Sequence, residues 1–554
     1  MSEWFLWVVA ALILLSGFSG ETAKELLTGQ VIPKGREPVD TVPLFNLWTV
    51  GWNSDRLAHG LFGYWHAPIF SPRLGTFAFS EPQPTTWAVA PLVWITGSIA
   101  IAYNVYLLAT LALNSLLTRL LLSRSGLPTI AAMFGGAMGL LLPFISWQLG
   151  VLQLTCLWGS LLMILGVMNL CERPTLRNGL LIGLSFGLTY ASCNYYGLMF
   201  ALLSPSLLIL VGHQWKYGKL WGSLAIGVIT AAVCVSPIVW AQLKYLAPDA
   251  SPRHIDRVET LSAYSDDYAW HRSPSLPWLN YHFGHPGRPL GVGGITLLLA
   301  VCGLCRGILV RTNWTVFLLA FSTAALTLSC GTHFEVWGWS PFVSLREWCP
   351  GVGYLRTPFR FAIFVQWGVT CLAAEGVATL WEWTARFQTW GLRISRSMVV
   401  LLPVLAIVET WPLPSRMTSP PDPTRNENWM TWIREETEPY ESLIHFPFAK
   451  DSSVASYEFT AEQMTLAFNY DRPLVNGYSG FFPDSHFLTK QAAVDFPGDF
   501  SEEAILWTGA SYAVVHLKEC EEWQREAFLK RTPLFHDQKA QVVIFPLPLP
   551  AALP

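Results

Sequence analysis

Charged residues are scarce in this chain, and their scarcity excludes several classes of protein. Asp, Glu, Lys and Arg make up 13% of the 554 residues, whereas soluble proteins carry about 25%. The formal net charge of -3 provides no basic surface for nucleic acid, so no nucleic-acid partner is expected. The sequence also lacks a nucleotide-binding motif, which argues against an enzyme that uses nucleotide sugars.

The 10 cysteines have no spacing that indicates disulfides or a zinc site. Cys302 and Cys305 form one C-x-x-C sequence without a second pair, so a metal or redox role there is the less favoured interpretation. Several others lie inside apolar segments, where cysteine behaves as a small hydrophobic residue: Cys156, Cys171, Cys193, Cys234 and Cys371. We therefore predict no cofactor, although acids and histidines of the first long loop could together hold a divalent metal.

Hydrophobic residues, in contrast, form 52% of the chain, and the mean hydropathy is +0.36. Long apolar runs predict an α-helical polytopic membrane protein with about eleven transmembrane helices. They cover residues 4–20, 99–122, 127–148, 151–171, 179–192, 195–212, 220–242, 290–309, 314–330, 361–383 and 398–411. The first could instead be a signal peptide, but no Lys or Arg precedes it, which favours a retained helix. Residues 87–97 predict a short helix in the membrane interface.

Basic residues in the short connections predict the orientation of the chain. Every second connection is basic, for example at Arg119 with Arg124 and at Arg173 with Arg177, and the short intervening ones carry no Lys or Arg. Because basic connections stay in the cytoplasm, we expect the long loops 21–86, 244–289 and 331–360 to lie outside an inner (plasma) membrane. Everything after residue 411 should lie on that outer side too.

The chain changes character after residue 412, which predicts two domains. Residues 1–412 form the membrane domain with its long first loop. Residues 413–554 begin with a Pro-rich linker and continue with short strands such as SLIHFPF, RPLVNGY, SYAVVHL and AQVVIFPL between helical stretches. This alternation predicts a small periplasmic or extracellular α/β domain. It contains no nucleophile elbow, P-loop or zinc spacing, so we expect it to cover the membrane domain.

The first long loop mixes tryptophans with ionisable groups, which is typical of a partly dry pocket at a membrane interface. Asp40 and Glu81 are its candidate catalytic acids, because a positioned carboxylate can act as general base on an acceptor hydroxyl. The alternative for Asp40 is a helix N-cap, and the alternative for Glu81 is a solvated loop residue. Trp52, Asp55 and His66 are further substrate-binding candidates, although Asp55 could simply pair with its neighbour Arg56.

Two arginines mark the start of a later apolar segment, in the sequence LRTPFRF. Arg356 and Arg360 are four residues apart and should share one face of a helix that starts at Pro358. Two guanidiniums at a membrane surface suit a phosphate or pyrophosphate head group. The alternatives are contact with lipid phosphates and an ion pair with Glu347.

A second exterior loop and two carboxylates inside apolar segments complete the candidates. The loop repeats the aromatic and charged mixture, so we expect it to face the first loop over one cavity; its residues are Asp266, Asp267, His271, Arg272 and Tyr281. A carboxylate within a membrane segment is a functional candidate by default. For Glu375, beside Ala373 and Gly376, tight helix packing is the favoured interpretation, and Glu409 lies near the end of the last segment.

This order of elements resembles the GT-C superfamily of integral-membrane glycosyltransferases, which use polyprenyl-phosphate-linked sugars. The similarity is to bacterial multi-span proteins of that type, and the stretches PLFNLWTVGW, APIFSP, FSEPQP, AYN and LRTPFRF carry it, within residues 4–411. The resemblance implies that Asp40 occupies the position of the catalytic acid, with Glu81 as the second acid. Many members have paired acids near the first helix, whereas this chain has Asp40 alone.

The resemblance also implies a reaction. A carboxylate would orient or deprotonate an acceptor, and Arg356 and Arg360 would meet the phosphate of the lipid-linked donor as it leaves. The transferred sugar would be a hexose or a pentose. Two alternatives stay open. A lipid or polysaccharide transporter would show internal repeats, which we do not find, and a non-catalytic envelope assembly protein would keep the fold without the chemistry.

Overall fold

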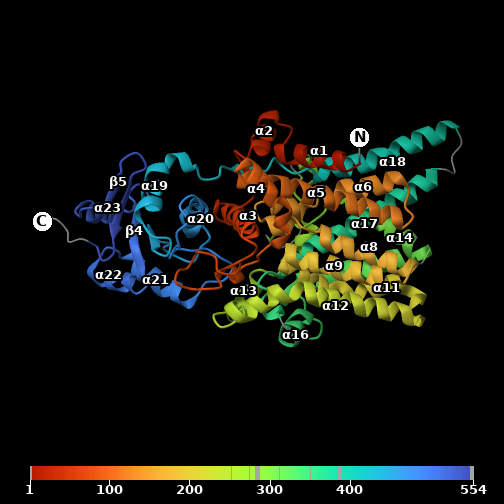
Figure 1. Cartoon of the computed structure of the whole chain (residues 1–554). Helices are drawn as coiled ribbons and strands as arrows, with labels where there is room; N and C mark the ends of the chain where they lie inside the picture. Colours follow the sequence, from red (N-terminus) through yellow and green to blue (C-terminus); the bar gives the residue numbers. More distant parts are fainter. Residues whose placement is uncertain are drawn as a thin grey trace. The chain divides into compact units, whose positions relative to one another are not determined.

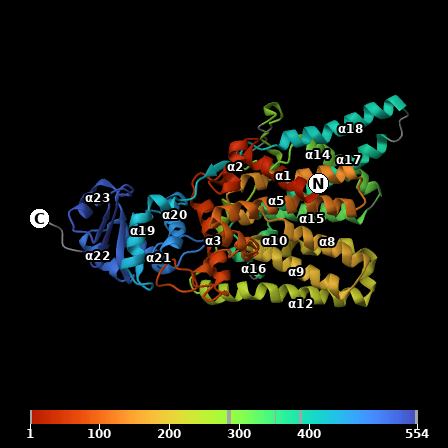
Figure 2. The same cartoon turned by 45° about the horizontal axis from the view of Figure 1, so that its top comes forward.

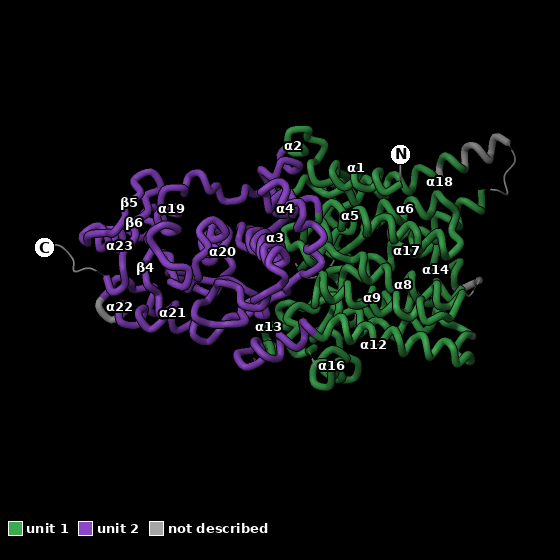
Figure 3. Tube along the Cα trace, viewed as in Figure 1, with its two compact units in different colours: residues 1–24, 106–236, 251–416 green, residues 25–105, 237–250, 417–554 purple. Residues whose placement is uncertain are grey.

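The computed structural model describes residues 3–250, 252–273, 275–280, 287–310, 312–349, 351–384 and 389–549. Tyr281 lies outside these residues. The chain forms two compact units, which have different colours in Figure 3, and Figure 1 labels their helices and strands. Unit 1 comprises Met1–Lys24, Tyr106–Ser236 and Ser251–Arg416, and unit 2 comprises Glu25–Val105, Pro237–Ala250 and Met417–Pro554.

Unit 1 is built from helices, most of which are labelled in Figure 2. They are α1 (Glu3–Ser16), α6 (Thr129–Leu140), α7 (Pro143–Trp147), α8 (Trp158–Glu172), α9 (Leu176–Ser192), α10 (Asn194–Leu203), α11 (Leu208–Val211), α13 (Ile255–Glu259), α14 (Gly294–Val310), α15 (Asn313–Ser329), α16 (Pro341–Trp348), α17 (Ala362–Thr384) and α18 (Thr389–Thr410). Three more helices have residues in both units: α2 (Gly20–Thr28), α5 (Ile99–Arg124) and α12 (Gly218–Ala241).

Six helical stretches of the described chain are long and apolar enough to cross a membrane. They are Ile99–Arg124, Thr129–Trp147, Leu152–Glu172, Asn194–Val211, Gly218–Leu246 and Pro358–Thr384. The bent pair α1 and α2 makes a seventh if it counts as one span, although the chain turns by 108° between the two helices. Parts of α14, α15 and α18 are shorter apolar helices. Every predicted segment therefore contains a helix, while the number of eleven spans stays a prediction.

Helix α17 lies at the centre of unit 1. In the apolar stretch Pro358–Thr384, which contains it, 94% of the most hydrophobic part is buried. It crosses α14 at two glycines, because a Cβ on Gly303 would lie 2.1 Å from the carbonyl oxygen of Leu372 and one on Gly376 would lie 1.9 Å from that of Leu299. Such close approach is typical of membrane helix pairs. Beside this crossing, the Glu375 carboxylate accepts the Thr315 hydroxyl at 2.9 and 3.0 Å. The packing interpretation of Glu375 is therefore the one that the contacts support.

Glu409, near the end of α18, also has a structural partner. Its two carboxylate oxygens accept the backbone N–H groups of Gly294 and Ile295, at 2.7 and 3.0 Å. These donors belong to the first turn of α14, where backbone N–H groups lack helical partners. A carboxylate at a helix N-terminus also interacts favourably with the helix dipole. Glu409 thus caps α14.

Unit 2 combines short helices with two sheets. Its helices are α3 (Thr41–Ala58), α4 (Ala90–Thr96), α19 (Glu427–Glu436), α20 (Glu458–Leu466), α21 (Asp484–Val494), α22 (Asp499–Leu506) and α23 (Glu522–Leu529). A two-stranded sheet joins β1 (Ile32–Gly35) to β2 (Arg416–Thr418). A four-stranded sheet has the order β3-β4-β6-β5, formed by Ser442–Phe446, Ala510–His516, Val542–Pro546 and Phe535–Asp537. β3 and β4 are parallel, and the other pairs are antiparallel.

The first long loop and the C-terminal residues share one hydrophobic core in unit 2. Phe45, Trp48 and Trp52 of α3 belong to the same buried cluster as Trp429 of α19 and Val514 of β4. Aromatic side chains of this size contribute much of the burial energy of a core. The loop is therefore packed as a folded element, and α3 is its scaffold.

The segment RPLVNGY, predicted as a strand, forms only an isolated bridge between Leu474 and Leu443. Its backbone pairs irregularly instead: Leu474 N donates to the Pro68 carbonyl at 2.9 Å, and Ser71 N donates to the Leu474 carbonyl at 2.8 Å. Pro473 has no N–H to donate, which limits regular pairing at this point.

Candidate active site residues

Asp40 lies at the start of α3, as the sequence predicted for a helix N-cap. Its carbonyl oxygen accepts the backbone N–H of Leu44 at 2.9 Å, but its side chain accepts no hydrogen bond from the first turn. The carboxylate contacts Lys34 Nζ at 2.5 Å instead, and it accepts the Thr418 hydroxyl. The side chain is 28% exposed, so Asp40 is an ion-paired carboxylate that solvent still reaches.

The backbone around Asp40 is held by α20 and the residues before it. Asp40 N donates to Glu458 Oε1 at 2.7 Å, and Thr41 Oγ1 donates to the Val454 carbonyl at 2.7 Å. One turn further along α20, burial raises the pKa of Glu462 to about 7, with smaller contributions from the negative charges of Glu458, Glu519 and Asp40. Glu462 therefore holds its proton up to neutral pH beside the Asp40 carboxylate.

Glu81 is buried, at 8% exposure, so it is not the solvated loop residue of the alternative interpretation. Polar contacts tie the residues after it to α3. Gln83 Nε2 donates to Asn46 Oδ1 at 2.8 Å, and Asn53 Nδ2 donates to the Pro82 carbonyl at 2.7 Å and to the Gln83 carbonyl at 3.1 Å. Gln83 adopts a left-handed backbone conformation, with φ +48°, which residues other than glycine rarely do.

Asp40 and Glu81 are thus both fixed to the same helix. Asn46 lies six residues after Asp40, which corresponds to about 9 Å along a helix axis. Helix α3 therefore begins at Asp40 and, through Asn46 and Asn53, contacts the residues that follow Glu81. Sequence reasoning identified both acids but not the two asparagines that contact the residues after Glu81.

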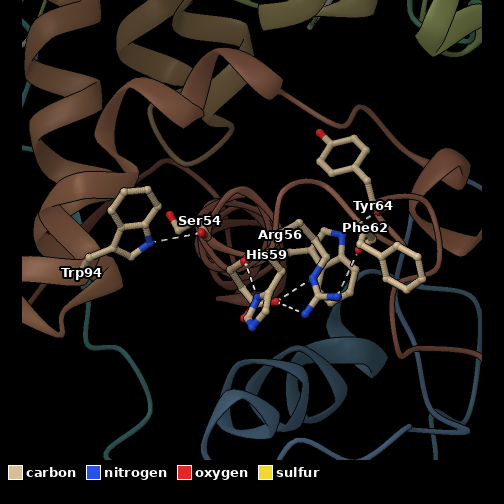
Figure 4. Close-up of polar contacts among 8 residues, drawn as sticks. Ser54, Arg56, His59, Phe62, Tyr64 and Trp94 are labelled. Atoms are coloured by element: carbon tan, nitrogen blue, oxygen red, sulfur yellow. Dashed lines mark hydrogen bonds and ion pairs between the residues drawn. The ribbon is translucent and has the colours of Figure 1, made fainter.

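The other candidates of this loop have local structural partners. Arg56 Nε donates to Asp55 Oδ2 at 2.6 Å, and the Arg56 guanidinium stacks on the Trp52 ring at 4.5 Å. Trp52 is 5% exposed and donates to the Tyr64 carbonyl at 3.0 Å. Figure 4 shows Arg56, His59 and Tyr64 of this group in one view. Asp55 pairs with its neighbour, and Trp52 is packed in the core.

His66 is exposed, and its Nδ1 accepts the backbone N–H of Gly75 at 3.1 Å. Its ring meets the edge of the Tyr245 ring, with centroids 5.5 Å apart. Among the described residues no group of three or more His, Cys, Asp or Glu side chains is arranged to hold a metal ion.

Arg356 and Arg360 belong to unit 1. The expectation that both share one helix face is wrong, because the short helix at this point covers Pro358–Phe361 and Arg356 precedes it. Pro358 disfavours helical geometry for the residue before it, and Thr357 accordingly has φ -130° and ψ 73°. Neither arginine pairs with Glu347 or with any other described carboxylate.

The two arginines are part of a larger cationic group, the arginine cluster, which also includes Arg253 and Arg346. The Arg360 guanidinium stacks on Tyr195 at 4.7 Å, and Arg346 donates to the Arg253 carbonyl. Burial and then the positive charge of Arg356 lower the pKa of Arg253, which indicates that these two guanidiniums are close.

Several donors of the arginine cluster are buried without an acceptor. Arg356 Nε, Arg360 Nε and Arg346 Nη1 have no hydrogen-bond partner among the described residues. A buried charged donor without a partner is costly. An anion with several oxygen atoms would satisfy such donors. Arg253 and Arg346 were not candidates from the sequence, because they lie about a hundred residues apart in two loops.

Comparison with known proteins identifies the fold. No known protein family and no curated protein matches the sequence. Among solved structures, arabinofuranosyltransferase AftD from Mycobacteria has a TM-score of 0.53 at 12% identity, over 93% of this chain and 35% of that chain. A mutant of AftD gives 0.53 at 15% identity, over 93% and 36%. Archaeal oligosaccharyltransferase AglB from Archaeoglobus fulgidus, in complex with an inhibitory peptide and a dolichol-phosphate, gives 0.46 at 12% identity, over 99% and 76%.

This chain spans about a third of the length of AftD. The match with AftD extends over 93% of this chain. The chain is therefore similar in fold to arabinofuranosyltransferase AftD.

Proposed function

We propose that the protein is a membrane glycosyltransferase that transfers a sugar from a polyprenyl-phosphate donor to an acceptor on the outer face of the membrane. In this proposal the eleven helical segments are embedded in the membrane, and the residues after 411 lie outside. The acceptor hydroxyl attacks the anomeric carbon, the bond from that carbon to the phosphate oxygen breaks, and the polyprenyl phosphate leaves with the bonding electrons. The acceptor proton passes to a carboxylate.

One observation carries this proposal: within the described part of the chain, Arg356, Arg360 and Arg346 have buried guanidinium nitrogens without acceptors. A phosphate monoester or diester offers oxygen atoms that fit the fork of an arginine. Arg356 and Arg360 would hold that phosphate and stabilise the charge that it gains as it leaves. The arginine cluster lies where the apolar helix α17 begins. The resemblance to GT-C enzymes therefore favours a lipid-linked phosphate as the anion that the cluster binds.

In this proposal the proton of the acceptor hydroxyl passes to an acid of unit 2. Asp40 is the proposed general base, because its carboxylate is partly exposed and held by hydrogen bonds. Glu81 is the second acid and would orient the acceptor or the sugar from its place beside α3. Trp52 and Asp55, which have structural partners, would act by keeping this scaffold rigid, and His66 is the exposed side chain of the group.

Binding of the lipid phosphate tests the carrying observation. Wild type, Arg356→Gln and Arg360→Gln would be reconstituted in nanodiscs and titrated with a polyprenyl monophosphate. Each substitution removes one charge-assisted contact of about 1.5–3 kcal/mol, so we expect dissociation constants about 10 to 100 times higher. Equal affinities of all three proteins would contradict the phosphate role.

Arg306→Gln is the matched control. Arg306 also lies on unit 1 and pairs with Glu382 at 2.5 Å near the other end of α17. Its loss removes the same charge without touching the arginine cluster, so its affinity should equal that of the wild type. If Arg306→Gln weakens binding as much as Arg356→Gln, the effect comes from net charge. Affinity without donor turnover would favour the non-catalytic alternative.

A further inference from the structure

The carboxylate of Asp40 is held by residues that lie far apart in the sequence. Lys34 on β1 and Thr418 on β2 are on the two strands of one small sheet, and each contacts a different oxygen of Asp40. Thr418 is separated from Asp40 by 378 residues, and Glu458, which accepts the Asp40 N–H, by 418. Three partners therefore hold Asp40.

We propose that Lys34, Thr418 and Glu458 are positioning residues for Asp40, so that the C-terminal part of the chain completes the catalytic base. This inference rests on the proposed function. Asp40 has a donor on each of its carboxylate oxygens, and its backbone N–H donates to a carboxylate.

The contacts limit the rotation that an aspartate otherwise retains. The last side-chain torsion of Asp is broad, so a free carboxylate would present its oxygens over many orientations. Here Lys34 fixes Oδ1 and Thr418 fixes Oδ2. The lone pairs that remain are the ones available to an acceptor hydroxyl. Misplacement of a reacting group by about 1 Å costs about a hundredfold in rate, so this orientation matters for catalysis.

The backbone contacts support the same role. An aspartate at the start of a helix usually bonds the first-turn N–H groups with its side chain, but Asp40 does not. Glu458 fixes the Asp40 N–H instead, and Val454 accepts the hydroxyl of the next residue, Thr41. The carboxylate is therefore directed to Lys34 and Thr418 while α20 holds the helix start.

Exposure separates this arrangement from a buried structural ion pair. The Asp40 side chain is 28% exposed, whereas Lys34 is 15% exposed and Thr418 is 6% exposed. The two donors are therefore more covered than the carboxylate that they hold. A carboxylate that donors hold in place and that solvent still reaches is suited to accept a proton from a substrate.

The experiment measures kcat and KM for a polyprenyl-phosphate sugar with full-length protein in nanodiscs. Thr418→Val keeps the shape of the side chain but removes the donor, and we expect kcat to fall about 10 to 100 times with KM for the donor within about twofold. Thr418→Ser restores the hydroxyl and should recover kcat to within about threefold. Lys34→Met should lower kcat in the same way.

The control is Thr489→Val, also in unit 2, because the Thr489 hydroxyl donates only to the Ser485 carbonyl of its own helix. It should leave kcat unchanged. Thermal unfolding of each variant identifies a loss of fold, and if Thr418→Val unfolds, Lys34→Met decides. Wild-type kcat in Thr418→Val and Lys34→Met, with Asp40→Asn inactive, would overturn the positioning inference alone. A wild type without donor turnover would overturn the proposed function and this inference with it.

Discussion

Substitution of Asn53 by Ala tests whether α3 holds the segment that carries Glu81. The Asn53 side chain is fully buried. Its Nδ2 donates to the carbonyl oxygens of Pro82 and Gln83 and to Thr86 Oγ1, and its Oδ1 accepts the Tyr64 hydroxyl at 2.7 Å. Every hydrogen-bonding group of this amide is therefore used.

The expected loss of folding stability in Asn53→Ala follows from the groups that lose a hydrogen bond. Thr86 Oγ1 also donates to the Gln83 carbonyl at 2.9 Å, so that carbonyl stays paired in the variant. The Pro82 carbonyl and the Tyr64 hydroxyl are left without Asn53. Each buried group without a partner costs about 1–3 kcal/mol, so we expect about 3 kcal/mol in total, which corresponds to a fall in melting temperature of about 6–12 °C for a domain of this size.

The assay is thermal unfolding of the protein in nanodiscs, followed by intrinsic tryptophan fluorescence. The matched control is Asn469→Ala, since Asn469 is exposed and donates one hydrogen bond to the Leu466 carbonyl at 3.0 Å. It should change the melting temperature little. Adding Tyr64→Phe to Asn53→Ala removes the hydroxyl that the first change left unpaired, so the two effects should be less than additive.

A melting temperature of Asn53→Ala within about 1 °C of the Asn469→Ala value would refute this reasoning. So would strict additivity with Tyr64→Phe. If Asn53 holds Glu81, the variant should also lose donor turnover at temperatures where it is still folded.

Three further predictions concern other parts of the chain. Burial lowers the pKa of His516 to about 3. Because the folded-state pKa is lowered, stability that is present above about pH 6.5 is lost as the pH falls toward 3. The melting temperature of His516→Gln should therefore fall less than that of the wild type between pH 6.5 and 4. Burial raises the pKa of Glu462 to about 7. Its stabilising contribution is therefore lost as the pH rises from about 4.5 to 7. The Glu462→Gln variant should melt at a higher temperature than the wild type at pH 8 and at the same temperature at pH 4. Trp337 is fully exposed in a two-residue turn with φ +52°, which suits a ring at the membrane interface. In 5-fluorotryptophan-labelled protein, the fluorine resonance of Trp337 should broaden with spin-labelled lipid and not with a soluble gadolinium chelate. The resonance of Trp507 of unit 2, which is 85% exposed, should broaden with the chelate and not with the lipid.

Local sequence patterns were sufficient to predict the long apolar helices. The predicted segment 99–122 is α5, Ile99–Arg124, and the predicted 361–383 is α17, Ala362–Thr384. Apolar runs of this length leave few other structures open to a backbone that must satisfy its own hydrogen bonds. The number of spans was less accessible, because α14, α15 and α18 have apolar parts too short to decide from composition.

The candidate acids were also accessible from the sequence, but their partners were not. Asp40 and Glu81 stood out as acids in an aromatic loop. Nothing near Asp40 pointed to Thr418 or Glu458, since these contacts join residues about 400 positions apart. Asn46 and Asn53 looked like ordinary polar residues of an amphipathic helix, and only the fold shows that both are fully buried.

The arginine pair illustrates the same limit. The spacing of Arg356 and Arg360 suggested one helix face, but Pro358 sets the helix start between them. What brings them into a group is Tyr195 at the start of α10 and the loop at Arg253, neither of which is close in sequence.

Transfer of a labelled sugar is the most direct test of the account. Wild type and Asp40→Asn, reconstituted with a radiolabelled polyprenyl-phosphate sugar, would be followed in a single turnover by the release of polyprenyl phosphate. The account predicts release by the wild type and a rate at least about a hundredfold lower for Asp40→Asn, with both proteins binding the donor equally. Equal release rates for the two proteins would contradict it.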